Sequence, residues 1–441
     1  MTNNTNNNDA SRQVIPRPEH NISRANISSA ALKVLYRLKS GGYQAYLVGG
    51  SVRDLLLDTH PKDFDISTDA TPEEVRALFN NCRLIGRRFR LAHVRFGREI
   101  IEVATFRAPS SDASDDHSVA EGSGRVLRDN VWGTFEDDVF RRDFTCNALY
   151  YDIRDFSVRD YVGGAQDIKD KKIRLMGEPE QRYREDPVRM LRAARFAAKL
   201  NFKIESKTAA PIPELASLLD NIPSARLFDE FGKMFQAGAA LATWHQLQTL
   251  GLLEHLFPWT VEWLAASSDE LPANKRIKFI ETALRNTDER IKQEKPVTPM
   301  FLFAVFLWGP VRERANYYMQ QEQMSEAQAL VIASDEMAVT QNSRIAVPKR
   351  FSYPMREIMR MQPRFEKRRG KRAQSLLGHK RFRAAYDLLL LRAELREVDT
   401  ELVQWWTDIQ ELPEYKKQQK LTAGKPRGKS SRRKRTGNRQ Q

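Results

Sequence analysis

Two aspartates in the segment DFDI, Asp63 and Asp65, are the residues best suited to chemistry. On a β-strand, residues two apart point to the same face, so the two carboxylates would be held side by side. Such a pair is costly unless a cation lies between its members, and Mg²⁺ favours carboxylates together with substrate phosphates. We therefore predict a divalent metal site on Asp63 and Asp65, with a solvated strand edge as the alternative interpretation.

A Gly-Gly turn precedes the aspartates by about a dozen residues, in the segment LVGGSVRD. The pattern predicts a strand that ends, a turn at Gly49 and Gly50, and a helix that begins. Glycine lets a ligand approach the backbone closely, and a helix N-terminus offers unpaired N–H groups with a partial positive charge. Arg53 adds a full positive charge. The turn is a candidate triphosphate site, although a purely structural turn has the same sequence signature.

A third carboxylate could complete a metal site, and the sequence offers two candidates. Glu102, in IIEVATF, could point to the same place from a neighbouring strand. Asp143, in RRDFTCNA, follows Arg141 and Arg142, which could bind a phosphate or a base. We prefer Glu102 on strand geometry, whereas Asp143 could instead cap a helix.

The segment REDPVRMLR holds a possible base-reading pair, Asp186 and Arg189. Residues three apart share one face of a helix, so the two side chains could act together. One accepts hydrogen bonds and the other donates them, which suits the edge of a base. A surface ion pair is the simpler alternative.

The elements that would position these residues change type along the chain. Strands alternate with helices up to about residue 178, which predicts an α/β domain. Residues 109–124 lack periodicity and should form a flexible loop, and beyond 178 the pattern is helical. The expected strands are 46–48, 63–66, 91–96 and 99–106, and the expected helices include 28–39, 51–57 and 72–80, the last opened by a capping box at Thr71.

Basic residues exceed acidic ones, 72 to 57, which gives a formal charge of +15 and indicates a polyanionic partner. From Lys416 onward the chain carries eleven basic residues and no acidic one, so this segment should be an unfolded, RNA- or DNA-binding arm. A solubilising tail is the alternative.

Two cysteines exclude a disulfide framework, and no apolar run predicts a signal peptide or a membrane span, so we expect a cytoplasmic protein.

Together, LVGGSVRD, DFDI, RRDFTCNA and REDPVRMLRAARF resemble the class II nucleotidyltransferases, the family of bacterial poly(A) polymerases and tRNA CCA-adding enzymes. The segment LIGRRFRLAHVRF, residues 84–96, resembles the poly(A) polymerase signature, as do RFRAAYDLLLLRAEL, Trp405-Trp406 and the basic tail. The resemblance implies an α/β nucleotidyltransferase palm followed by helical neck, body and leg regions. The implied boundaries are a disordered segment 1–24, head 25–155, neck 156–230, body 231–345, leg 346–412 and disordered tail 413–441.

The resemblance also implies a mechanism, and it favours Asp143 as the family's third acidic site, so both Asp143 and Glu102 stay catalytic candidates. Asp63 and Asp65 would hold two Mg²⁺ ions while an RNA 3′-hydroxyl attacks the α-phosphorus of ATP and pyrophosphate leaves. The implied nucleotide contacts are Gly49, Gly50, Arg53, Arg142, Asp186, Arg189, Arg192 and Arg195. The implied RNA contacts are Lys367, Arg368, Arg369, Lys371, Arg372, Lys380, Arg381, Arg432, Arg433, Lys434 and Arg435.

The implied activity is template-independent addition of AMP to RNA 3′ ends, with a role in RNA processing and decay alongside RNA-decay proteins. We expect a monomer that does not bind membranes. A CCA-adding enzyme is the alternative within the family, because an Asp–Arg pair can read adenine or cytosine. A catalytically inactive RNA-binding protein is the alternative of another class, and the intact Asp63 and Asp65 argue against it.

Overall fold

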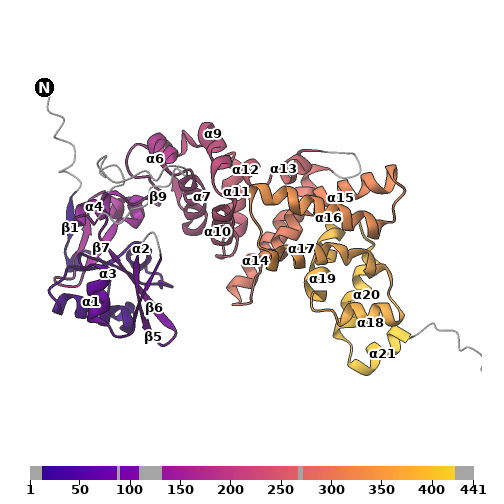
Figure 1. Cartoon of the computed structure of the whole chain (residues 1–441), viewed down its shortest axis with the longest axis horizontal. Coiled ribbons are helices and arrows are strands. Elements are labelled where there is room, and N and C mark those ends of the chain that lie inside the picture. The colour runs from indigo at the N-terminus through magenta and orange to yellow at the C-terminus, as the bar shows by residue number, and fades with distance from the viewer. Residues whose placement is uncertain (1–11, 87–89, 109–131, 267–271, 423–441) are drawn as a thin grey trace, which may run out of the picture. The chain divides into compact units, whose positions relative to one another are not determined.

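The computed structural model describes residues 12–86, 90–108, 132–266 and 272–422 (Figure 1). The chain divides into two compact units. Unit 1 comprises residues 1–222 and 242–252, and unit 2 comprises residues 223–241 and 253–441. The expected loop at 109–124 lies outside the described residues.

An eight-stranded mixed sheet forms the centre of unit 1 and confirms the predicted α/β class. Its strands pair antiparallel except for β3 and β6, which run parallel. The spatial order is β1 (Gln13–Ile15), β8 (Val158–Asp160), β7 (Leu149–Asp152), β2 (Ala45–Val48), β3 (Asp65–Thr68), β6 (Glu99–Thr105), β5 (Leu91–Phe96) and β4 (Cys82–Ile85).

Two helices, α1 (Ser29–Ser40) and α3 (Pro72–Leu78), pack against the strands of this sheet. The Ser28 hydroxyl accepts a hydrogen bond from the Ala31 amide and so caps α1. Thr71 and Glu74 form the predicted capping box of α3. Both helices therefore begin where their capping residues stand in the sequence.

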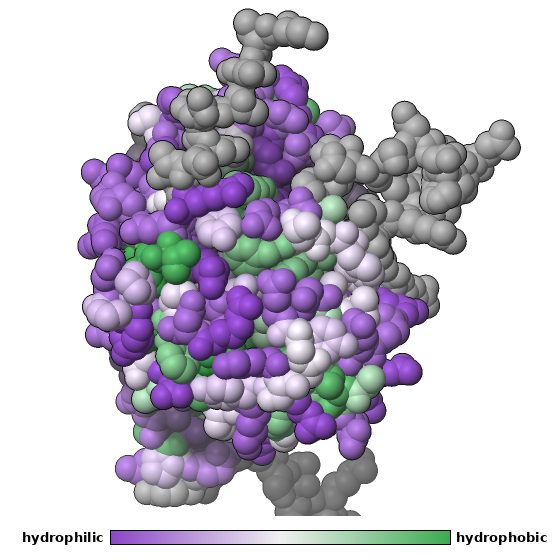
Figure 2. Space-filling model, turned by 90° about the vertical axis from the view of Figure 1, so that its left-hand side faces the viewer, coloured by the Kyte–Doolittle hydropathy of each residue, from purple (hydrophilic) through white to green (hydrophobic). Residues whose placement is uncertain are grey.

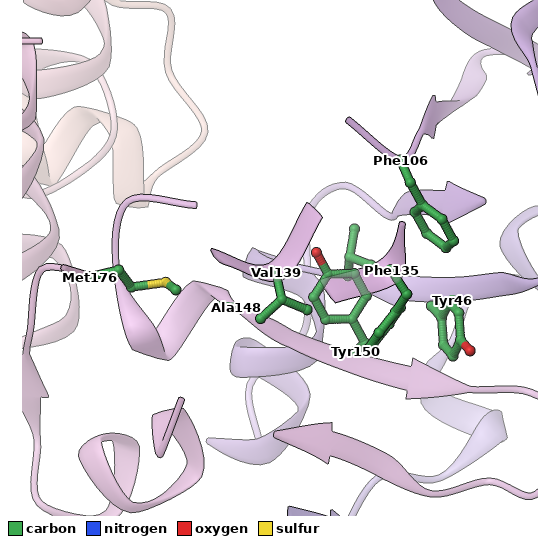
Figure 3. Packing of buried hydrophobic residues seen from close by; sticks show 8 residues of the cluster. Tyr46, Phe106, Phe135, Val139, Ala148, Tyr150 and Met176 are labelled. Carbon is green, nitrogen blue, oxygen red and sulfur yellow. The ribbon is translucent and has the colours of Figure 1, made fainter. Parts of the chain in front are cut away.

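A third helix, α4 (Phe135–Phe140), packs on the aromatic residues of β2 and β7. Its Phe135 ring lies 4.8 Å from the rings of both Tyr46 and Tyr150, between centroids (Figure 3). Val48 is buried in the same cluster. Because Tyr46 and Val48 are two apart on one strand, they mark the sheet face that α4 covers. Arg141 and Arg142 follow directly after α4, so the packing of this helix fixes the backbone position of both arginines.

The sheet extends beyond both predicted ends of the head, 25–155. Residues 12–24 were expected to be disordered, but β1 pairs with β8, and Ile15 and Ile22 are buried. The sequence did not predict β1, because a strand of three residues is too short to show a hydrophobic periodicity. The strand β4 was also missed, because its four residues alternate between partly buried and exposed positions rather than being apolar throughout.

The remainder of unit 1 is mainly helical. One expectation was wrong: strands do not end at residue 178, since Lys203–Ile204 (β10) pairs in parallel with Lys172–Ile173 (β9). Strands of two residues carry no readable periodicity. The helices are α5 (Gly164–Lys169), α6 (Pro179–Glu185), α7 (Val188–Leu200), α8 (Ser206–Ala209), α9 (Ile212–Leu215) and most of α11 (Ala240–Thr249).

Unit 2 is helical in its described residues, as predicted. The long helix α15 (Pro299–Gln321) buries Phe303, Phe306 and Trp308 among its neighbours. The other helices are α10 (Ser224–Phe235), α12 (Leu253–Leu256), α13 (Pro258–Ala265), α14 (Ala273–Lys292), α16 (Glu326–Arg344), α17 (Lys349–Arg360), α18 (Gly370–Leu377), α19 (Phe382–Glu394), α20 (Thr400–Glu411) and α21 (Glu414–Thr422). The predicted borders between neck, body and leg stay predictions.

The tail 413–441 was expected to be disordered, and this is wrong for its first residues. Helix α21 packs against α18 and α20, and Leu421 is only 4% exposed. An argument from composition overlooks a single apolar side chain, such as Leu421, that is buried among many polar residues. Arg432, Arg433, Lys434 and Arg435 lie outside the described residues.

The surface of the molecule is largely polar where Figure 2 shows it, with hydrophobic colour confined to separate patches. No helix within the described ranges is both long enough and apolar enough to cross a bilayer.

Candidate active site

The Gly-Gly turn lies where the sequence predicted it, between β2 and helix α2 (Gly50–Leu56). Gly49 has φ 71° and ψ −131°, a backbone conformation that side chains with a Cβ rarely adopt. A Cβ at Gly49 would also lie 3.3 Å from Nη1 of Arg142. Since α2 has only seven residues, its dipole is modest, and the close approach of Arg142 gives the turn a full positive charge.

The two aspartates lie at and before the start of β3. The strand begins at Asp65, so Asp63 is not a strand residue as predicted. Burial nevertheless alternates through the segment: Phe64 and Ile66 are buried, while Asp63 and Asp65 keep accessible surface, although the surrounding protein partly desolvates the Asp65 carboxylate. The carboxylates therefore lie on the exposed side of an extended segment, as the i and i+2 argument required.

Glu102 lies directly beside Asp65, because the parallel register of β3 and β6 pairs the two residues. On the other side of Glu102, the antiparallel register of β5 and β6 pairs it with His93. The His93 Nε2 lies 3.5 Å from Glu102 Oε2. The sheet thus aligns His93, Glu102 and Asp65 across three strands, and this is the placement that strand geometry predicted for Glu102.

These acidic groups repel one another. Desolvation raises the pKa of the Asp65 carboxyl to about 6, the negative charges of Glu102 and Asp63 add to the rise, and Arg142 opposes it. The raised pKa of Asp65 therefore reflects first its desolvation by the surrounding protein and second the negative charges beside it. Oxygen donors in such a group match the preference of Mg²⁺. Within the described residues, no three His, Cys, Asp or Glu side chains already form a metal cage.

Arg142 is held from several sides. Its Nε donates to the Tyr150 hydroxyl at 2.6 Å, and its Nη2 lies 3.2 Å from Asp138 Oδ2 and 3.3 Å from Ser67 Oγ. Burial disfavours the arginine charge, but Tyr150 and Asp138 outweigh it and raise the pKa of Arg142 above its usual value. Arg142 is therefore a fixed cation between the turn and the carboxylates.

The sequence reasoning missed Asp138, the residue that orients both arginines after α4. Its side chain is fully buried, and it accepts hydrogen bonds from Arg141 Nε at 2.8 Å and from the Tyr150 hydroxyl at 2.7 Å. Burial raises the pKa of the Asp138 carboxyl, but Arg142 and Arg141 more than compensate and lower it overall. The spacing of four residues between Asp138 and Arg142 could have revealed this helical pair.

Asp143 takes a different position from Glu102. Its carboxylate accepts from Arg189 Nε at 2.9 Å and pairs with Arg192 Nη1 at 2.6 Å. Both arginines belong to α7, so Asp143 joins that helix to the segment after α4. The structure therefore brings Glu102 beside Asp65 and engages Asp143 with the arginines that were predicted to read the base.

Asp186 does not share a helix face with Arg189, and that prediction was wrong. Asp186 ends α6 with φ −148° and ψ 94°, and α7 begins only at Val188. Pro187 forces the residue before it out of the helical conformation, which the spacing argument ignored. The Asp186 carboxylate accepts a hydrogen bond from the Val188 amide at 3.2 Å.

Arg53 lies inside the protein rather than at the surface of the turn. Its side chain is 3% exposed, Nη1 donates to Asn147 Oδ1 at 2.6 Å, and the other donors bond Asp54. The guanidinium groups of Arg53 and Arg195 both lie near the Phe196 ring, at 5.7 Å and 4.2 Å from its centroid. Arg53 in this state holds α2 in place, and its contact with a triphosphate stays a prediction.

The predicted RNA-binding residues of unit 2 that are described lie in and around α18. Arg368 pairs with Glu401 at 3.1 Å, and Arg381 lies 3.7 Å from Glu357. The others are exposed: Lys367, Arg369, Lys371, Arg372 and Lys380. Their RNA-binding role stays a prediction.

Comparison with known proteins gives three family models along the chain. Residues 45–174 match the poly A polymerase head domain, residues 201–264 match the probable RNA and SrmB-binding site of polymerase A, and residues 322–441 match the polymerase A arginine-rich C-terminus.

Curated relatives agree with these models. Poly(A) polymerase I of Salmonella typhi is 52% identical over 402 residues, which cover 90% of this chain and 85% of the relative. Poly(A) polymerase I of Escherichia coli O157:H7 is 51% identical over 401 residues, with the same coverage. The CCA-adding enzyme of Lactobacillus helveticus is 41% identical, but over only 46% of this chain and 49% of its own length.

Solved structures support the fold. The Thermotoga maritima CCA-adding enzyme complexed with tRNA matches with a TM-score of 0.55 at 20% identity, covering 88% of this chain and 82% of that one. A tRNA-processing enzyme in an apo form matches with a TM-score of 0.55 at 22% identity, covering 89% of this chain and 94% of that one.

Proposed function

The chain belongs to the bacterial poly(A) polymerase family and is a nucleotidyltransferase that adds adenylate to RNA 3′ ends, and on this premise we propose roles for the residues of the site. Asp63, Asp65 and Glu102 act as the metal-holding carboxylates. The observation that carries this assignment is the register pairing of Asp65 with Glu102, together with the Asp65 pKa of about 6.

A divalent cation fits this group of residues. Desolvation, followed by the like charges of Glu102 and Asp63, raises the proton affinity of Asp65, and a bound Mg²⁺ would offset the same unfavourable negative charge that a proton otherwise neutralises. When bound there, Mg²⁺ would make the RNA 3′-hydroxyl easier to deprotonate and neutralise charge on the phosphates of ATP.

The protein's own groups would position the triphosphate. Gly49 leaves space for a phosphate to approach the backbone, and Gly50 begins α2 beside it. Arg142, fixed by Asp138 and Tyr150, supplies a cation that needs no reorientation when charge develops on the leaving pyrophosphate. The side chain of Ser67 bonds both Arg142 and Asp138 and so keeps the guanidinium aligned.

Base recognition would use the arginines of α7. Arg189 and Arg192 share the Asp143 carboxylate, and Arg189 Nη1 also donates to the Arg182 carbonyl oxygen at 2.7 Å. These bonds restrict the rotamers of both arginines before a nucleotide arrives. Asp186 would supply the acceptor for the exocyclic amine of adenine, and Arg195 would support the group by its contact with Phe196.

The wider role follows from the activity. We propose that the added tails promote RNA processing and decay, that the enzyme acts in the cytoplasm, and that it works with RNA-decay proteins. A 3′ tail without secondary structure offers an exonuclease a starting point, and the excess of basic residues supports binding of many transcripts.

An extension assay with each of the four nucleoside triphosphates tests this function. Purified protein, Mg²⁺ and an unstructured RNA should yield long tails from ATP alone, with pyrophosphate released. Addition that stops after CCA on a tRNA would contradict the proposal. Binding of RNA without pyrophosphate release from any triphosphate would support an inactive RNA-binding protein instead.

A further inference from the structure

A cavity of about 600 Å³ lies in unit 2 between α14, the start of α15 and α19. Part of its lining is apolar, with Phe301 and Leu391. Part is charged: five basic residues, among them Lys295 and Lys380, outnumber three acidic ones. The acidic residues are Glu289, Asp387 and Glu394. A lining that combines apolar side chains with an excess of basic ones can hold the two parts of a nucleotide, a flat base and a phosphate.

A second cavity, also about 600 Å³, lies between α17 and the turn that joins α18 to α19. Tyr353 lines it and is 57% exposed, an unusual position for a large aromatic side chain. The guanidinium of Arg356 lies 4.8 Å from the Tyr353 ring centroid. Arg364 adds a further exposed positive charge to the lining.

The two cavities meet at Lys380 and Arg381, which line both. These residues form part of the short connection between α18 and α19. A chain that occupied both cavities would therefore pass over two adjacent basic residues, which suits a backbone with one negative charge per nucleotide.

Several cations in the two cavities are available to a ligand. Arg356 pairs with Asp335, and Arg383 pairs with Asp387 at 3.0 Å, so their charges are largely compensated. In contrast, Lys295, Arg364 and Lys380 form no ion pair within the part of the chain that the structure describes. When unpaired basic side chains of this kind neutralise phosphates, the counterions bound to the nucleic acid are released, which favours binding.

We propose that the two cavities form one binding track for single-stranded RNA, with bases on Phe301 and Tyr353 and phosphates on Lys295, Lys380 and Arg364. Duplex RNA would not fit, because its bases are stacked inside the helix and cannot enter cavities. The inference rests on the RNA substrate of the proposed function and adds a site that includes α14 and α15, outside the predicted basic cluster.

The charge part of the proposal is tested with the triple variant Lys295→Gln, Arg364→Gln and Lys380→Gln in the full chain. A matched control replaces Arg285, Lys292 and Lys349 by Gln, since these are exposed but line neither cavity. Anisotropy titrations over a salt series should show that the track variant flattens the slope of log affinity by about 2, at about 0.7 per phosphate contact. Equal flattening in the control would overturn the proposal.

The base part is tested with Tyr353→Ala, which removes no charge. We expect affinity for a short single-stranded RNA to fall roughly fivefold or more, with no change for a duplex of the same sequence. Equal loss for both RNAs, or no loss for the single strand, would overturn the base contact. Circular dichroism melting of each variant checks the fold.

Single-turnover adenylate transfer over a series of RNA concentrations separates this inference from the proposed function. The control variant, whose residues line neither cavity, should keep the transfer rate of the parent protein, whereas the track variants should need a higher RNA concentration to reach half-maximal transfer. Absence of transfer in the parent protein would refute the proposed function, whereas normal transfer with unaltered RNA affinity in the variants would refute only the track.

Discussion

The head of unit 1 and the basic helices of unit 2 handle charge in opposite ways. In the head, charged side chains near the turn have fixed partners: Asp138 holds Arg141 and Arg142, and Asp143 holds Arg189 and Arg192. Around α18, most basic side chains stand exposed along the surface, and only Arg368 and Arg381 among the predicted RNA-binding residues described there have acidic partners. Reaction chemistry needs positions held within a fraction of an ångström, whereas binding of a flexible polyanion needs only sufficient charge.

This difference predicts how each region responds to mutation. Single changes in the head should have large effects on the reaction rate, and single changes in the basic region should have small effects on RNA affinity. Variants of both regions test that contrast, beginning with the largest expected effect.

Replacing Asp65 by Asn should reduce adenylate transfer about 100-fold or more, because positioned charge at the reaction centre is removed. RNA affinity should stay within about twofold of the parent, since Asp65 is not an RNA-binding cation. Pyrophosphate release measures the first effect and anisotropy the second. Glu99→Gln, an exposed acid on the same strand as Glu102, is the matched control. Retention of more than a tenth of the activity would be hard to reconcile with a metal-holding role.

Glu102→Gln and Asp143→Asn should impair adenylate transfer in different ways. Loss of a metal-holding carboxylate raises the Mg²⁺ concentration needed for half-maximal transfer, so Glu102→Gln should shift that value about tenfold. Asp143→Asn should leave it unchanged and raise KM for ATP, because Arg189 and Arg192 lose their shared partner. A Mg²⁺ titration of both variants decides, and a shift in Asp143→Asn alone would reverse the assignment.

Asp138→Ala should destabilise the head by about 3 kcal/mol, because it leaves Arg142 with one partner fewer in a buried position. KM for ATP should rise as the guanidinium loses its orientation. Asp137→Ala, whose carboxylate caps α4 at the surface, should cost only about 1 kcal/mol and leave KM unchanged. Thermal melting and initial rates over an ATP series measure both. Unchanged KM in Asp138→Ala would show that Arg142 does not contact ATP.

Removal of residues 424–441, a segment outside the described residues, takes away eight basic side chains. We expect an unchanged melting temperature and ATP affinity, together with a moderate loss of RNA affinity. The salt dependence should flatten by about 0.7 for each phosphate that the segment no longer neutralises. Added tails should be shorter at physiological salt. If the truncated and full chains show the same slope of log RNA affinity against log salt, the segment does not bind RNA and serves only as a solubilising tail.

The smallest effect concerns pH. The folded-state pKa of Asp65, about 6, lies above that of an unfolded aspartate, so ionisation destabilises the folded protein as pH rises from about 4 to 6. Asp65→Asn should therefore melt roughly 1–2 °C higher than the parent above pH 6 without Mg²⁺, with the difference shrinking as pH falls toward 4. Melting at several pH values measures this. A difference that grew at low pH would contradict the electrostatic account.

Sequence reasoning located the turn at Gly49, the carboxylates and Glu102, because each depends on local pattern or strand period. It failed where position depends on distant pairing. The pairing of Asp143 with α7 and the burial of Arg53 arise from packing between segments far apart in the chain. Asp186 was misplaced for a local reason, since Pro187 separates it from the helix that holds Arg189.

The strand β1 has a consequence for the handling of the protein. It is the edge strand beside β8, it has only three residues, and Pro16 follows it at once. A short edge strand offers few free N–H and C=O groups to another molecule. A chain trimmed to begin after Ile15 would uncover the outer edge of β8, which is also three residues long but, unlike β1, is not followed at once by a proline. The expected outcome of trimming is therefore a head that keeps its chemistry but self-associates on concentration.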